Sequence, residues 1–224
     1  MRKIYCFWFG GEMSHDRFNC LNSIINNSGC EVILVTEGNL KSFEVSEYPI
    51  HDGFKYLSST HKSDYLRSYF MYFYGGGYTD IKYCNYDWNP YFDLLDNSDK
   101  DFTSYRELGE DAVAYKEWNN HIRFKYNELG GMCHYIFKPK SDFGLKWFEL
   151  TNKKMDEIYE TLKENPGNYH PRAVTGGAHQ GPQDDSKYPL IWNDLLGQLL
   201  HNLMYENIGG FLLDMPFPNT WGYR

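Results

Sequence analysis

The sequence lacks any cysteine arrangement that indicates a metal site or a disulfide framework. Its cysteines are odd in number, and no two of them form a Cys-x-x-Cys pair. Structural zinc sites and disulfide-rich secreted domains use paired, closely spaced cysteines, so neither is expected. The simplest interpretation is a reduced protein of the cytoplasm, in which Cys6, Cys20, Cys30, Cys84 and Cys133 are free thiols.

Long hydrophobic runs are also missing. No window approaches about 18 uninterrupted apolar residues, so no transmembrane segment is expected. The opening residues MRKIYCFWFGG contain neither a long apolar run nor a small-residue cleavage site. We therefore expect no signal peptide and a soluble, intracellular chain.

Positive charge is scarce and scattered. The formal net charge is −8 and the isoelectric point is about 5.5. No Lys/Arg cluster has the footprint of a protein that binds a phosphate backbone, so a nucleic-acid partner is not expected. An anionic ligand must then be held by a few local cations, because the field of the whole protein would repel it.

The residues that are present fit one α/β domain over residues 1–224. Residues 2–9 and 31–36 are short runs of strand-forming residues, and between them Ser14 begins a segment with apolar residues at helical spacing. This βαβ beginning predicts a mostly parallel sheet flanked by helices. Further strands are expected at 79–83, 102–105, 111–115 and 133–137, and further helices between 58 and 75 and at 141–164 and 189–205.

Aromatic residues are abundant, at 18% of the chain, with 20 Tyr and 6 Trp. Their flat apolar faces suit stacking on a sugar or a base, and they suit the edges of a core equally well. The oligomeric state leaves no signal in the sequence.

Charged side chains lie on either side of a glycine triplet, at Asp64, Arg67, Asp80 and Lys82. The first two stand three residues apart in the helix expected before the triplet. The last two stand two apart in the strand expected after it, where alternate side chains share a face. Ligands of α/β sheets bind where parallel strands end. Carboxylates and two cations at such a place suit a polar anion such as a nucleotide diphosphate.

The triplet itself, Gly75–Gly77, has two interpretations. Because Gly76 and Gly77 lack side chains, they allow a ligand to approach the backbone closely. Alternatively, the triplet is only the turn that ends a helix, and Asp64 and Arg67 are only an exposed helix pair worth about 0.2–0.5 kcal/mol. The triplet alone is neither a Walker loop nor a GxGxxG motif.

The linked pattern around these residues is more specific. Residues 63–67 read Ser-Asp-x-x-Arg, and residues 74–80 read Tyr-Gly-Gly-Gly-Tyr-x-Asp. Together they resemble the signature of DXD-type glycosyltransferases, written S-D-x-x-R…Y-G-G-x-Y-x-D-x-D, which include the capsular polysaccharide synthesis and mannosyltransferase-like families. Residues 4–10 are similar to the opening strand of that group. The resemblance is dense over residues 61–80 and thin elsewhere.

The resemblance implies a GT-A-like, Rossmann-like fold and an enzyme that moves a sugar from a UDP- or GDP-sugar to a glycan hydroxyl. Residues 1–105 would form the donor-binding half and residues 106–224 the acceptor-side half. The donor contacts that it implies are Phe7, Trp8 and Phe9 at the base, Thr36 at the base or ribose, Asp64 at the ribose or base, Arg67 at the diphosphate or donor sugar, and Asp80 as the first DXD carboxylate.

The sequence departs from the pattern at the second carboxylate, where Lys82 follows Asp80 and Ile81. In the family pattern the carboxylate pair coordinates a divalent cation, which needs several oxygen ligands. Two arrangements stay open. Either Lys82 neutralises the diphosphate directly, or Asp80 holds Mn²⁺ or Mg²⁺ mainly through the phosphates of the donor while Lys82 turns away. We expect metal dependence to be weak, and Asp87 lies too far along the chain to restore the pair.

Glycine-containing segments of the second half are candidate sugar contacts. The resemblance makes the segment with Asn127, Gly130 and Gly131 one that approaches the transferred sugar, and Thr175 with Gly176 a second one. For the first segment, an ordinary turn before a strand is the alternative interpretation.

The polar loop at residues 175–189 is the candidate place for acceptor contacts and catalysis. His179 is a candidate acceptor contact. Asp184 or Asp185 would serve as the carboxylate base of an inverting transfer, whereas a retaining transfer can use the leaving phosphate itself. A solvated acidic loop is the alternative for at least one of these aspartates.

Two other functions fit parts of the pattern. A non-catalytic carbohydrate-binding module would use the tyrosines and tryptophans, but it would not bind a nucleotide. A sugar-phosphate transferase would release a nucleoside monophosphate rather than a diphosphate. Binding of UDP or GDP separates a glycosyltransferase from the first alternative, and the identity of the released nucleotide separates it from the second.

Overall fold

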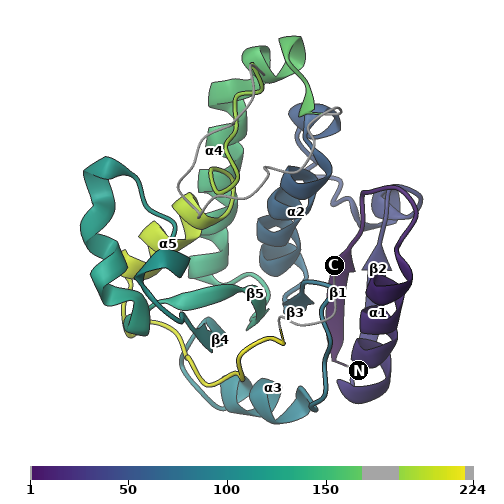
Figure 1. Cartoon of the computed structure of the whole chain (residues 1–224), viewed down its shortest axis with the longest axis vertical. Helices are drawn as coiled ribbons and strands as arrows, with labels where there is room; N and C mark the ends of the chain where they lie inside the picture. The colour runs from purple at the N-terminus through teal and green to yellow at the C-terminus, as the bar shows by residue number, and fades with distance from the viewer. Residues whose placement is uncertain (1, 168–186, 220–224) are drawn as a thin grey trace.

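The computed structural model describes residues 2–167 and 187–219. Its centre is a five-stranded sheet in the order β2-β1-β3-β5-β4 (Figure 1). The strands are β1 (Lys3–Phe7), β2 (Glu31–Val35), β3 (Gly76–Thr79), β4 (Phe102–Arg106) and β5 (Gly130–Phe137). β1 pairs in parallel with β2 and β3, whereas β5 pairs antiparallel with β3 and β4. The predicted α/β class with one sheet is confirmed, and the sheet has a parallel and an antiparallel half.

Helices cover both faces of this sheet (Figure 1). They are α1 (His15–Asn27), α2 (Ser59–Phe73), α3 (Asn89–Asp96), α4 (Asp142–Glu164) and α5 (Gly197–Glu206). On one face, α2, α4 and α5 share a hydrophobic core, and on the other face α1 and α3 contribute to a second core. Short 3₁₀ helices occupy the connections, at η1 (Leu40–Phe43), η2 (Asp52–Tyr56), η3 (Glu110–Ala112) and η4 (Glu117–Glu128). The boundary predicted between residues 105 and 106 falls inside β4.

β1 belongs to both cores because it lies in the interior of the sheet. Tyr5 and Phe7 pack in the core of α2 and α4, whereas Ile4 and Cys6 pack in the core of α1 and α3. Side chains alternate between the two faces of a strand, so a short strand of apolar residues is buried on both sides. Burial on both faces holds β1 in place, and the candidate site lies at the end of this strand.

α2 begins where its capping residue predicts. The Ser58 hydroxyl accepts a hydrogen bond from the His61 amide, which satisfies a free donor of the first turn. The aromatic stripe of the helix is buried against the sheet and α4. The Asp64 and Arg67 side chains are also buried, at 4% and 10% exposed. The alternative interpretation of these two residues as an exposed helix pair is therefore wrong.

The strand after the glycine triplet lies earlier than the sequence predicts. The prediction was residues 79–83, but β3 spans Gly76–Thr79. Gly77 lies opposite Ile4 of β1 and opposite Ile136 of β5. Pairing on both sides outweighs the weak intrinsic preference of glycine for strands. As a result, Asp80 comes directly after the strand instead of lying within it.

Residues 111–115, predicted as a strand, form no ladder. The Val113 amide donates to the Glu110 carbonyl at the end of η3, and the Ala114 amide donates to His201 Nδ1 at 2.8 Å. Both apolar side chains are fully buried. The apolar side chains of this segment therefore pack in the core, and the Val113 and Ala114 amides donate to acceptors outside the sheet.

The last helix is shorter than predicted, and one helix is additional. α5 begins at Gly197 rather than near residue 189, and Trp192, expected to face inward, is 45% exposed. Before α5, the Ile191 amide donates to Asp194 Oδ2 at 3.1 Å, so the chain there forms a local turn. α3 has no counterpart among the predicted helices, because its eight residues give too short an apolar pattern.

We predict that Gly76→Ala destabilises the protein more than Gly209→Ala. Both glycines have a positive φ, 80° and 84°, which costs other residues about 1–2 kcal/mol. A Cβ on Gly76 would also lie 2.8 Å from the Lys3 carbonyl oxygen, whereas a Cβ on Gly209 would meet nothing within 4 Å. Gly76→Ala should therefore lose about 1–3 kcal/mol more unfolding free energy in urea denaturation. Equal losses would contradict the close approach of β3 to β1.

Candidate functional site

Three parallel strands end at the same edge of the sheet and deliver three candidate residues there. Trp8 follows β1, Thr36 follows β2 and Asp80 follows β3. The strands run in the same direction, and Tyr5 lies opposite Tyr78, so Asp80 emerges level with the end of β1. The carboxyl edge of parallel strands is the usual ligand edge of an α/β sheet.

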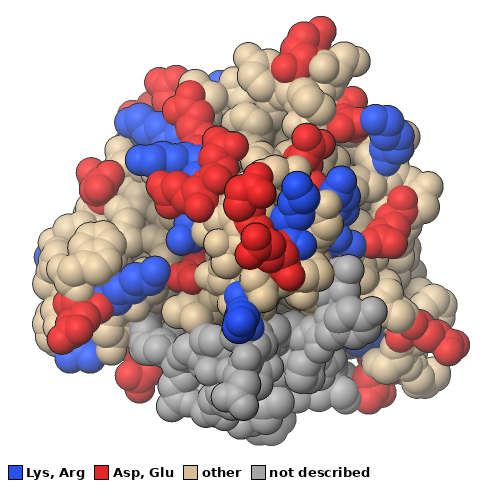
Figure 2. All heavy atoms as spheres, turned by 90° about the horizontal axis from the view of Figure 1, so that it is seen from above, with Lys and Arg blue, Asp and Glu red and all other residues tan. Residues whose placement is uncertain are grey.

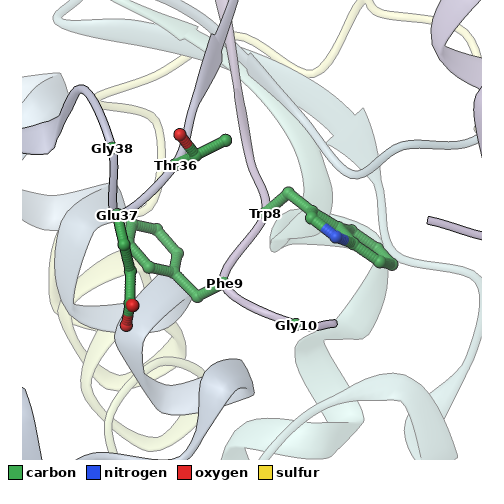
Figure 3. Close-up of a pocket in the computed structure, with 6 residues that line it drawn as sticks. All are labelled: Trp8, Phe9, Gly10, Thr36, Glu37 and Gly38. Carbon is green, nitrogen blue, oxygen red and sulfur yellow. The ribbon is translucent and has the colours of Figure 1, made fainter. Parts of the chain in front are cut away.

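A pocket of about 220 Å³ opens between the ends of β1 and β2. Figure 3 shows Trp8 on one side of it and Phe9, Thr36 and Glu37 on the other. Its lining residues are Trp8, Phe9, Gly10, Thr36, Glu37 and Gly38. The structure thus brings together three of the five residues predicted at the base and ribose, whereas Asp64 is buried beside Arg67 and does not line the pocket. Phe7 lies outside the pocket, because its ring packs in the core at 5.0 Å from that of Phe70.

Local hydrogen bonds shape this pocket. The Trp8 amide donates to the Val35 carbonyl at 2.9 Å, and the Trp8 indole donates to the Gly11 carbonyl at 2.7 Å. On the other side, the Thr36 amide donates to Asn39 Oδ1 at 2.8 Å. Both walls are therefore tied to the strand ends, so the pocket is formed before any ligand enters.

The Asp80 carboxylate gathers the charged residues of the site. Arg67 Nη2 donates to its Oδ1 at 2.9 Å, and the Tyr78 hydroxyl donates to the same oxygen at 2.7 Å. Lys82 Nζ lies 3.5 Å from Oδ2. The Asp80 side chain remains 25% exposed, so this buried network reaches the surface at the carboxylate.

Arg67 connects Asp80 to the interior. Its Nη1 donates to the Met132 carbonyl at 2.9 Å, and its Nη2 lies 3.6 Å from Asp64 Oδ1. The guanidinium also lies over the Tyr78 ring, 4.3 Å from the centroid. The predicted convergence of Asp64, Arg67 and Asp80 is therefore present, with Lys82 as a fourth member of alternating charge.

Burial and charge act differently on the two carboxyls. Burial would raise the pKa of Asp80, but Arg67, Lys82 and the hydrogen bonds from Tyr78 and Cys133 together lower it. Burial raises the pKa of Asp64 to about 7, against a smaller lowering by Arg67 and with a further increase from Asp80. Arg67 directs its shortest contacts to Asp80 and to the Met132 carbonyl, so it stabilises the Asp64 carboxylate only weakly.

The family of capsular polysaccharide synthesis proteins matches residues 1–170 of the chain. The chain belongs to this family. This confirms the resemblance to capsular polysaccharide synthesis proteins that the signature indicated. Membership of the family gives the chain a role in polysaccharide biosynthesis. No match was found among curated proteins or among solved structures. The matched region includes β1–β5 and the cluster of Asp64, Arg67, Asp80 and Lys82, whereas α5 lies beyond it.

Four glycines predicted near the site pack closely within the sheet. A Cβ on Gly77 would lie 2.8 Å from the Trp88 ring, and one on Gly131 would lie 2.0 Å from the Tyr105 ring. Gly76, as described above, faces the β1 backbone. A Cβ on Gly130 would lie 3.1 Å from the Ser104 Cβ, and the Gly130 amide donates to Met204 Sδ at 3.4 Å. Close packing of strands and rings accounts for these four glycines.

Other predicted contacts lie elsewhere. Asn127 is exposed at the end of η4, where its carbonyl accepts a hydrogen bond from Arg106. Five predicted residues of the acceptor side lie outside the described residues, namely Thr175, Gly176, His179, Asp184 and Asp185.

The start of β5 contributes contacts that sequence reasoning missed. The Cys133 carbonyl accepts from the Asp80 amide at 2.7 Å, and the Cys133 thiol accepts from Lys82 Nζ at 2.8 Å. Met132 supplies the carbonyl that holds Arg67. The neighbouring Gly130-Gly131 pair marked this segment, but only the antiparallel pairing of β5 with β3 shows which atoms meet Asp80.

The side chains at Asp80 do not fit a divalent cation. Such a cation takes several oxygen ligands, and Lys82 stands where the family pattern has its second carboxylate. Asp87 does not supply the missing carboxylate. Its Oδ1 accepts from the Asn89 amide and lies beside Gly29, which is in the turn after α1. Within residues 2–167 and 187–219, no group of three or more His, Cys, Asp or Glu side chains is arranged to hold a metal ion.

Surface charge gives no alternative anion site on the face that Figure 2 shows. Acidic and basic side chains are interspersed there over the described residues.

Among the described helices, none is both long enough and apolar enough to cross a membrane.

We predict a pH-dependent cost from Asp64. The pKa of this carboxyl is about 7 when folded and 3.8 in its ordinary state. Between these values the folded protein holds a proton that the unfolded chain has released, so a rising pH lowers the unfolding free energy. Above the folded pKa this contribution is constant. Asp64→Asn should remove it, so the stability of the variant relative to wild type should rise with pH until about 7.

Urea denaturation across that pH range measures the effect. Asp99→Asn is the matched control, because the Asp99 side chain is 85% exposed, and its stability curve should run parallel to that of the wild type. A parallel curve for Asp64→Asn as well would contradict the raised pKa of Asp64.

Proposed function

We propose that this member of the capsular polysaccharide synthesis family is a glycosyltransferase that moves a sugar from a UDP- or GDP-sugar to a glycan hydroxyl. One observation carries the proposal. The Asp64, Arg67, Asp80 and Lys82 cluster lies at the same strand edge as the pocket of Trp8 and Thr36. An aromatic pocket beside local cations suits a nucleoside diphosphate, which has a flat base at one end and negative charge at the other.

The base and ribose would occupy the pocket between β1 and β2. The Trp8 ring offers a flat face for the base, and Thr36 with Glu37 offers polar groups for the ribose hydroxyls. Glu37 is already held by Lys62 Nζ at 2.6 Å, so its carboxylate stays at the pocket wall. The diphosphate would then extend from β1 toward the end of β3.

The charged cluster would receive that diphosphate. Lys82 and Arg67 both contact Asp80 directly after the end of β3, so the carboxylate keeps the two cations together. Attraction that strengthens as the leaving diphosphate gains charge lowers the barrier of sugar transfer. Asp64 contributes by holding Arg67 from within the protein.

The transfer forms a bond between the acceptor oxygen and the anomeric carbon and breaks the bond from that carbon to the phosphate oxygen. The electron pair of the broken bond leaves with the nucleoside diphosphate. The acceptor proton passes to a carboxylate in an inverting reaction, for which Asp184 and Asp185 remain the candidates. In a retaining reaction it passes to the leaving phosphate. Thr175, Gly176 and His179 remain candidates for holding the acceptor.

A panel of UDP-, GDP- and CMP-sugars tests the proposal by thermal shift and by release of the nucleotide. We expect one UDP- or GDP-sugar to raise the melting temperature and to release a nucleoside diphosphate when a glycan acceptor is added. Release of UMP or GMP from a UDP- or GDP-sugar would instead indicate a sugar-phosphate transferase. A carbohydrate-binding module would respond to none of the nucleotides.

We predict that Trp8→Ala weakens nucleotide binding while the fold is kept. Stacking of a base on an aromatic ring contributes about 1–3 kcal/mol, so affinity should fall by about 10- to 100-fold. Trp118→Ala is the matched control, because Trp118 is 73% exposed on η4, away from the pocket. Calorimetric titration with UDP and GDP measures both variants. Equal affinities in Trp8→Ala and Trp118→Ala would place the base elsewhere.

A further inference from the structure

Lys82 is held against Asp80 rather than turned away from it. Besides its contact with Asp80, its Nζ donates to Cys133 Sγ at 2.8 Å. The backbone of the turn is tied at both ends, since the Lys82 amide donates to the Asp80 carbonyl and the Asp80 amide donates to the Cys133 carbonyl, each at 2.7 Å. Arg17 Nη1 also donates to the Ile81 carbonyl at 2.7 Å. The ammonium is therefore in place before a ligand arrives.

Both oxygens of Asp80 already contact positive groups. Oδ1 accepts from Arg67, and Oδ2 faces Lys82. A divalent cation at Asp80 would meet two positive side chains at short range, and such repulsion is strong where burial lowers the dielectric. The cation would also have one carboxylate where it needs several oxygen ligands.

We propose that Lys82 takes the place of a divalent cation in this protein, so that its ammonium neutralises the donor diphosphate directly and binding needs no metal ion. This inference rests on the proposed function, because it assumes a nucleotide-sugar donor. An ammonium is a compact charge with three donors, which suits phosphate oxygens. Asp80 then acts as a positioning residue that aims Lys82.

Arg67 cannot take over this part. Its side chain is about as buried as that of Lys82, 10% against 11% exposed, but both of its Nη atoms are already engaged, Nη1 by the Met132 carbonyl and Nη2 by Asp80, with Asp64 3.6 Å away. Its charge thus offsets that of the buried carboxylates. Lys82 lies at the other oxygen of Asp80, and its fixed position makes it the cation that meets the ligand.

Titration with UDP and GDP in the presence of EDTA, and again with Mn²⁺, is the first test. We expect the nucleotide that binds to have the same affinity in both conditions. Lys82→Met should weaken that affinity by about 10- to 100-fold, because a charge-assisted hydrogen bond to phosphate is lost. Mn²⁺ should not restore it, since Asp80 alone is a poor site for the ion.

Lys82→Asp provides a gain-of-function test with a readout apart from activity. It creates the Asp-x-Asp pair of the family pattern and removes a positive charge from Asp80. Electron paramagnetic resonance with Mn²⁺ alone should detect binding to this variant and none to the wild type. With Mn²⁺ present, the variant should regain nucleotide affinity that it lacks in EDTA.

Lys100→Met is the matched control for Lys82→Met, because it removes the same positive charge before β4. β4 starts opposite the end of β5, and this end also faces the start of β3, so Lys100 lies at the edge of the sheet away from Asp80. The control should bind nucleotide as the wild type does, and it should bind no Mn²⁺.

The outcomes distinguish the inference from the proposed function. Wild-type binding of UDP or GDP that is abolished by EDTA and restored by Mn²⁺ would overturn the role of Lys82 and leave a glycosyltransferase. Binding of neither nucleotide under any condition would overturn the proposed function itself. A Lys82→Asp variant that remains indifferent to Mn²⁺ would also count against the inference.

Discussion

The site depends on the neutralisation of one buried cation, Arg67. A guanidinium removed from water is costly unless its donors and its charge are met. Here Asp80 and the Met132 carbonyl accept from its two Nη atoms, Asp64 lies 3.6 Å away, and the Tyr78 ring lies beneath, while Nε has no hydrogen-bond partner among the described residues. These partners come from α2, from the end of β3 and from the start of β5, so one charge holds three elements at one sheet edge. The same contacts fix the carboxylate that orients Lys82.

The family signature combines two kinds of residue in this chain. Asp64, Arg67 and the glycine strand build the edge of the sheet, and they stay in the pattern of capsular polysaccharide synthesis proteins. The residue after Ile81 determines the charge that faces the ligand. At this position the chain has Lys82, where the pattern has a carboxylate. A lysine is accommodated at this point because the Cys133 thiol accepts from its ammonium. The architecture of the site can therefore be kept while its means of neutralising phosphate changes.

Much of this arrangement could be predicted from the sequence, because periodicity and capping are local. β1, β2, α2 and α4 lie where the patterns indicate, and the linked signature around Asp64, Arg67 and Asp80 predicted that they form one site. Long-range pairing could not be predicted. It extends β3 through Gly76 and Gly77, and it leaves residues 111–115 out of the sheet because the Ala114 amide bonds to His201. The contacts of Cys133 likewise depend on a strand that enters from the opposite direction.

The antiparallel entry of β5 has a consequence for how the edge is assembled. β5 lies between β3 and β4, and its first residues reach Asp80 from more than 50 positions along the chain. A fragment ending near residue 105 would leave β3 with one unpaired side, and such open strand edges attract other chains. Synthesis must therefore proceed past Phe137 before β5 can contact Asp80 and Lys82. The half of the molecule that would hold the donor is thus completed only after the other half has begun to fold.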